Sequence, residues 1–127
     1  TWDSSNAAVL IEKAAEFEYA NKKKLKDRNI VYAYSFGNEL DLNADLFADG
    51  LKELYNLVEK SYTKNSIENK PKIIGTDHRH FDKRFFQQLI PKVRNELFAV
   101  TWHNYPLGAS YGDFQVDRIK SKLENPW

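Results

Sequence analysis

The sequence contains no cysteine and no methionine in 127 residues. A chain without cysteine forms no disulfide and offers no thiol nucleophile, but this does not locate the protein, because cysteine-free stretches occur in secreted and cytosolic chains alike. The 19 basic and 18 acidic residues nearly cancel, so nothing indicates the charged surface that nucleic acids or membranes attract. No apolar run approaches the roughly 20 residues that cross a bilayer. We therefore expect no nucleic-acid partner and no transmembrane segment.

The chain also lacks an initiator methionine, a signal segment and any Asn-x-Ser/Thr glycosylation acceptor. It begins with Thr-Trp and ends with Asn-Pro-Trp directly after a helical pattern. We interpret it as an internal piece of a longer protein, and a targeting segment of a secreted parent would lie outside this stretch.

Apolar spacing alternates along the chain between that of helices and that of strands. Helical spacing predicts helices over 7–17, 47–62, 85–93 and 116–123. The first of these places Leu10, Ile11 and Phe17 on its apolar stripe, and Pro91 is expected to kink or end the third. Short apolar runs predict strands over 30–36, 72–76 and 97–102. The run 30–36 shows no polar alternation, which is typical of a strand buried on both faces of a parallel sheet.

Strands that alternate with helices predict an α/β fold built from parallel βα units. A doubly wound open sheet usually carries a glycine-rich phosphate turn, and the five glycines here form none. Three strands are too few for a closed (β/α)8 barrel, which takes about 250 residues. We therefore predict residues 1–127 to be a partial TIM-barrel domain. An independent α/β binding domain is the plainer alternative.

Polar residues follow the carboxyl ends of all three predicted strands, the edge where such barrels place their chemistry. They are Asn38 and Glu39, then Thr76 and Asp77, then His103, Asn104 and Tyr105. The competing interpretations are an acidic residue that starts a helix, for Glu39, and a polar plug at the barrel mouth, for His103 and Tyr105.

Four segments together resemble the catalytic barrel of heparanase-type enzymes, glycoside hydrolase family 79. They are Trp-Asp-Ser-Ser-Asn-Ala at 2–7, Gly-Asn-Glu at 37–39, Gly-Thr-Asp at 75–77 and Val-Thr-Trp-His-Asn-Tyr at 100–105. The resemblance covers essentially the whole chain in the right order. It implies retaining β-glucuronidases acting on heparan sulfate or related uronic-acid glycans, and it places this chain at about strands four to six of the barrel.

That resemblance also implies roles for individual residues. A retaining glycosidase needs two carboxyl groups about 5–5.5 Å apart. Glu39 matches the acid/base, whose pKa must lie near the working pH, and Asn38 matches the residue that binds the sugar 2-hydroxyl. Tyr105 matches a tyrosine that hydrogen-bonds the nucleophile, and His103, two residues earlier, would project the same way. The nucleophile would lie outside this chain, so we expect the chain alone to be inactive.

The chain departs from the family at residues 42–45, where human-like heparanases carry lysines that meet sulfated sugar. A basic cluster after Asp77, which includes His78 and Arg79, lies where the family binds anionic glycan. The alternative is a solvated charged surface.

A further alternative is a metal site formed by His78 and His80 with His103 as third ligand. We expect neither a metal nor a cofactor. The expected partners are an anionic polysaccharide substrate and the remainder of the barrel.

Two classes of function remain open at this point. One is a glycoside hydrolase that is secreted, in the extracellular matrix or lysosomal, as the resemblance implies. The other is a homologue that keeps the barrel for glycan or partner binding without catalysis. A glutamate near the seventh strand of the full-length protein would separate them.

Overall fold

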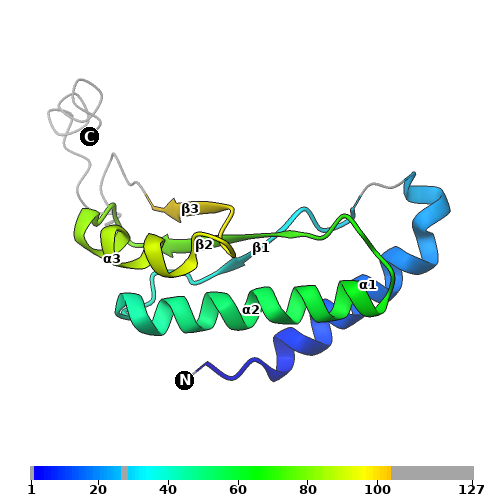
Figure 1. Ribbon diagram of the computed structural model, residues 1–127, viewed down its shortest axis with the longest axis horizontal. Coiled ribbons are helices and arrows are strands. Elements are labelled where there is room, and N and C mark those ends of the chain that lie inside the picture. The colour runs from blue at the N-terminus through cyan, green and yellow to red at the C-terminus, as the bar shows by residue number, and fades with distance from the viewer. Residues whose placement is uncertain (1, 27–28, 104–127) are drawn as a thin grey trace, which may run out of the picture.

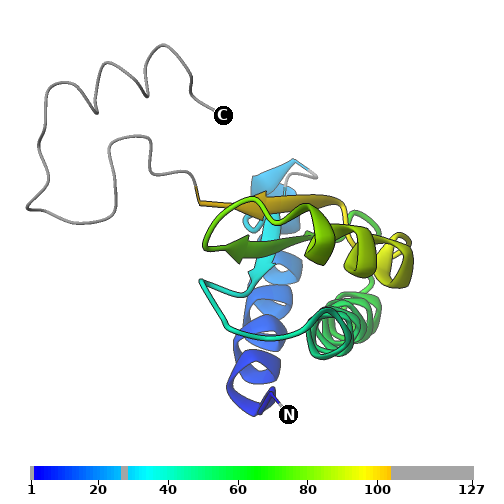
Figure 2. The same ribbon diagram turned by 90° about the vertical axis from the view of Figure 1, so that its left-hand side faces the viewer.

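The computed structural model describes residues 2–26 and 29–103. Its elements follow in the order α1 (Ser5–Leu25), β1 (Ala33–Phe36), α2 (Ala44–Lys64), β2 (Lys72–His78), α3 (Lys83–Val93) and β3 (Ala99–Trp102). The strands form one sheet in the order β1-β2-β3, and both pairs are parallel. Figures 1 and 2 show α1 and α2 on one side of this sheet, with α3 beside α2. The predicted α/β class with parallel strands is confirmed, and the arrangement is compatible with part of a βα fold.

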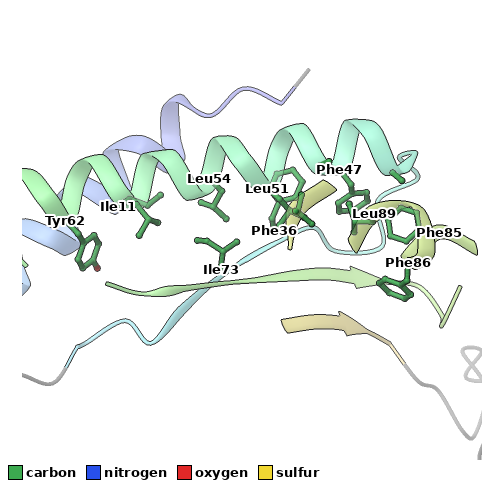
Figure 3. Close-up of a cluster of buried hydrophobic side chains, with 14 of the residues drawn as sticks. Ile11, Phe36, Phe47, Leu51, Leu54, Tyr62, Ile73, Phe85, Phe86 and Leu89 are labelled. Carbon is green, nitrogen blue, oxygen red and sulfur yellow. The ribbon is translucent and has the colours of Figure 1, made fainter. Parts of the chain in front are cut away.

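Helix α2 supplies the centre of the core. Asn43 caps its start, with its side-chain oxygen accepting hydrogen bonds from the amides of Asp45 and Leu46. The helix predicted over 47–62 is present and buries an apolar stripe, and Leu54 of α2 points toward Ile73 of β2 (Figure 3). The buried residues of this stripe are Phe47, Leu51, Leu54, Val58 and Tyr62.

Helix α1 buries a narrower stripe than its sequence predicts. Ile11, Ala15 and Glu18 are buried, whereas Leu10 and Phe17 are 64% and 59% exposed. The helix contacts only α2 among the described elements, and one helix contact cannot cover its whole apolar surface. Within the described structure, the prediction of a buried side chain was correct for Ile11 and wrong for Leu10 and Phe17.

Two strands are shorter than predicted because other groups take their backbone amides. β1 begins at Ala33 instead of residue 30, since the amides of Ile30 and Val31 donate to the Glu18 side chain. β1 is also not buried on both faces as predicted, because Ser35 is exposed. β3 begins at Ala99, two residues later than predicted, because the Leu97 amide still donates a hydrogen bond to the Val93 carbonyl at the end of α3.

β2 extends beyond its predicted end, and α3 continues past Pro91 to its predicted end at Val93. β2 runs to His78, two residues further than expected. Pro91 lies inside the last turn of α3, and the helix ends two residues later. The proline has no amide hydrogen to donate within the helix, which is consistent with the end of α3 two residues later. The predicted helix over 116–123 lies outside the described residues. No helix among the described residues has the length and apolarity needed to cross a membrane.

Candidate active site at the carboxyl ends of the strands

The chain turns sharply where β1 ends, and Gly37 makes this turn possible. Gly37 has a φ of +104°, which residues with a side chain rarely adopt. A Cβ at this position would lie 2.3 Å from the Thr76 carbonyl oxygen and 2.9 Å from the Phe47 ring. The turn therefore packs directly against the end of β2 and leaves no room for a side chain.

Glu39 is fixed by its backbone at the start of the next loop. Its φ is +53°, in the left-handed region, and its amide donates a 2.8 Å hydrogen bond to the Asp77 carbonyl oxygen. Asp77 itself has a φ of +46°. Left-handed backbone at residues other than glycine persists only where surrounding structure enforces it, and it is common at functional sites.

The Glu39 carboxylate contacts side chains from the ends of the two other strands. His103 Nδ1 lies 2.7 Å from Glu39 Oε1, and Arg79 Nε lies 3.8 Å from Glu39 Oε2. The His103 amide donates a 2.7 Å hydrogen bond to the His78 carbonyl oxygen, which fixes the end of β3 against β2. The Glu39 and His103 side chains are 32% and 27% exposed, so solvent and a ligand can reach this carboxylate. Of the predicted site residues, the structure thus brings Glu39, Arg79 and His103 together.

Asp77 acts as a structural link in the described structure. Its Oδ2 accepts a 2.5 Å hydrogen bond from the Ser35 hydroxyl of β1, and its amide donates to Thr101 Oγ1 of β3. These bonds connect all three strands at the edge that carries Glu39. Substrate binding by Asp77 stays a prediction. Ser35 and Thr101 were not identified from the sequence, because small hydroxyl residues inside a strand run give no distinctive signal.

Asn38 lines a cavity whose lining includes neither Glu39 nor His103. It is exposed, and the cavity has a volume of about 560 Å³ with a mainly apolar lining. Trp2, whose ring packs edge-on against Phe36 at 5.0 Å, forms part of the wall. Asn38, which lines this cavity, directly precedes Glu39 in the sequence. The cavity is large enough to admit a sugar unit.

The histidines after β2 turn toward α3. The His78 ring stacks on the Phe85 ring, with ring centroids 4.5 Å apart and an interplanar angle of 12°. The Nδ1 atom of His78 is buried without a hydrogen-bond partner among the described residues. Donor atoms of His78, His80 and Asp82 lie within 4.8 Å of one another. His103, the third ligand of the metal alternative, contacts Glu39 and is not among these donor atoms. Tyr105, also predicted for the site, lies outside the described residues.

The site can now be compared with known proteins. No curated protein and no solved structure matches the chain. The family model described as "Glycosyl hydrolase family 79, N-terminal domain" matches residues 1–125. This range contains every described strand end and the Glu39 carboxylate with its two neighbours. The chain therefore belongs to glycosyl hydrolase family 79.

Proposed function

We propose that this chain is part of a retaining glycoside hydrolase that cleaves β-glucuronosyl linkages in heparan-sulfate-like or other uronic-acid glycans, with Glu39 as its acid/base. The observation that carries the proposal is the Glu39 carboxylate at the carboxyl end of β1, in contact with His103 and close to Arg79. Membership of a glycosidase family supports the reaction class. We place the parent protein in the extracellular matrix, another secreted location or the lysosome.

The parallel strands support a place for this chain inside a (β/α)8 barrel, at about strands four to six. A barrel gathers the carboxyl ends of its strands around one opening. The second carboxylate of the reaction would then come from a later strand, about 5–5.5 Å from Glu39. Residues 1–127 contribute one of the two catalytic groups under this proposal, and the remainder of the barrel contributes the other.

The proposed reaction uses Glu39 twice. In the first step the protonated Glu39 carboxyl gives its proton to the departing glycosidic oxygen, while the nucleophile attacks the sugar. In the second step the Glu39 carboxylate takes a proton from water, which displaces the nucleophile from the glycosyl-enzyme. The His103 contact holds Oε1, so the carboxyl group keeps one orientation through both steps.

Asn38 and Arg79 suit the recognition of a uronic acid. Asn38 is exposed and directly precedes the acid/base in the sequence, and under this proposal its amide hydrogen-bonds the sugar 2-hydroxyl. The Arg79 side chain is 67% exposed, and its Nε is too far from Glu39 for a direct hydrogen bond. A guanidinium pairs well with a planar carboxylate. A bound uronate would therefore recruit Arg79 away from Glu39.

Replacing Glu39 with alanine in the complete enzyme tests the assignment. Glu39→Ala should slow cleavage of glucuronides with poor leaving groups far more than that of activated aryl glucuronides, which need little protonation. Azide should restore the second step by attacking the glycosyl-enzyme without a base, and the product should be the β-glucuronosyl azide. The exposed Asp41, two residues further along, supplies the matched control, and Asp41→Ala should keep the wild-type ratio of the two rates.

Equal loss of both substrate classes, with no azide product or with an inverted α-azide, would show that Glu39 is not the acid/base. A wild-type enzyme without turnover of any glucuronide would instead favour the non-catalytic glycan-binding homologue.

A further inference from the structure

A second cluster of chemically active side chains follows directly after β2. His78 ends the strand, His80 lies in the short loop, and Asp82 caps the start of α3. One donor atom from each of the three residues lies within 4.8 Å of the others. We propose that these residues bind a divalent transition-metal ion, with Zn²⁺ as the best match. The proposal rests on this cluster and not on the glycosidase assignment.

The donor set selects the class of ion. Two imidazole nitrogens and one carboxylate oxygen suit Zn²⁺ and its neighbours, whereas Ca²⁺ and Mg²⁺ prefer oxygen ligands alone. Ligands about 2.0–2.1 Å from a tetrahedral zinc ion lie roughly 3.3 Å apart. Donor atoms up to 4.8 Å apart therefore have to approach one another by up to roughly 1.5 Å, a movement within the range of side-chain rotation at the exposed His80.

Packing holds two of the ligands in place before any ion arrives. The His78 ring is stacked on Phe85, and Asp82 Oδ1 accepts a 3.0 Å hydrogen bond from the Phe85 amide. Phe81, which lies between His80 and Asp82 in the sequence, stacks on Phe86 with ring centroids 5.6 Å apart. An ion would meet a loop that is already ordered.

The buried imidazole nitrogen of His78 is a second observation that supports metal binding. Nδ1 of His78 has no hydrogen-bond partner among the described residues. A buried polar atom without a partner destabilises a fold, and native structures rarely leave one without a reason. Coordination of this nitrogen would supply the partner, because an imidazole binds metal through either ring nitrogen.

The experiment is a zinc titration of the complete enzyme after removal of metals with EDTA. Calorimetry with ZnCl₂ gives affinity and stoichiometry, and Co²⁺ absorption in the visible range reports the ligand geometry directly. His80→Ala and Asp82→Asn should each lower the affinity for one equivalent of Zn²⁺ at least about tenfold. Even the loss of a residue that hydrogen-bonds a metal ligand lowers metal affinity by about 10–100-fold. Asparagine caps helices as well as aspartate does, so Asp82→Asn removes the charged ligand without removing the cap.

Asp41→Asn is the matched control, because it removes an exposed carboxylate outside the cluster and should leave zinc binding unchanged. Circular dichroism confirms that each variant is folded, and His78→Ala is avoided because the ring packs on Phe85. Wild-type protein that binds no zinc would overturn the proposal. Unchanged zinc affinity in both His80→Ala and Asp82→Asn would overturn it equally.

Discussion

The buried carboxylate of Glu18 offers a sharp test of how this fold is held together. Glu18 lies on α1 and is only 4% exposed. Its Oε1 accepts hydrogen bonds from the amide of Ile30 at 3.1 Å, the amide of Val31 at 3.0 Å and the hydroxyl of Tyr62 at 3.2 Å. One oxygen therefore joins α1, α2 and the segment that leads into β1. We predict that Glu18→Ala strongly destabilises the protein.

The magnitude follows from the three donors that lose their acceptor. Hydrogen bonds to charged groups contribute about 1.5–3 kcal/mol each. Water can take the place of the lost acceptor at Ile30, which is 48% exposed, whereas the fully buried Tyr62 hydroxyl keeps its 3.5 Å contact with the Tyr34 hydroxyl. We therefore expect Glu18→Ala to lower the free energy of unfolding by roughly 3–5 kcal/mol, a large share of a typical 5–15 kcal/mol. Glu18→Gln keeps a carbonyl acceptor and should cost about 1 kcal/mol.

Equilibrium urea denaturation of the complete protein measures these differences. Glu16→Ala is the matched control on the same helix, because Glu16 forms an exposed ion pair with Lys13 at 2.7 Å. Such surface pairs contribute about 0.2–1 kcal/mol, so this variant should stay near wild type. If Glu18→Ala lost no more stability than Glu16→Ala, the interpretation of Glu18 as the link between α1 and β1 would be refuted.

Three further predictions follow from the same contacts. Gly37→Ala should lower the free energy of unfolding by at least roughly 1–3 kcal/mol, measured by thermal denaturation. The reasons are the positive φ of Gly37 and the Thr76 carbonyl oxygen, which would lie 2.3 Å from the new Cβ. Wild-type stability of this variant would contradict the tight packing of the turn against β2. Burial raises the pKa of the Tyr62 hydroxyl above its ordinary 10.0, so unfolded chains ionise first and stability should fall as pH rises above 10. Tyr62→Phe should make this alkaline loss shallower in urea titrations between about pH 9 and 11, and an unchanged slope would exclude Tyr62 as its source. Residues 1–127 expressed alone should show no glucuronidase activity above a Glu39→Ala control. The same fragment should associate through the edges of β1 and β3. A monomer in sedimentation that also unfolds cooperatively would disprove this association.

The sequence predicted best what depends on local pattern. α2 has a cap, a clear apolar stripe and a polar end, and its structure matches the prediction. β1 was predicted too long because its first amides are taken by Glu18, twelve residues earlier, and no local pattern reports that contact. A signal did exist, because Glu18 stands at helical spacing from the buried Ile11 and Ala15. A charged residue on a buried stripe indicates a partner that the sequence does not identify.

The site could be predicted only as far as strand order determines it. Parallel strands bring their carboxyl ends to one edge, and this sufficed to place His103 near Glu39. The hydrogen bonds that join Ser35 and Thr101 to Asp77 depend on register, which the sequence does not give. Asp82 was missed as a companion of His78 because a residue at a helix start is usually explained by capping alone.

The end of β2 explains how one short segment can carry two different kinds of chemistry. Asp77 and Arg79 contact β1 and the Glu39 loop, whereas His78 lies against α3 and its donor atoms group with His80 and Asp82. Asp77 and Arg79 thus belong to the proposed glycan site, and His78, His80 and Asp82 form the proposed metal site. Because the two sets share a backbone but no side chain, substitutions at Arg79 and at His80 should separate glycan recognition from metal binding.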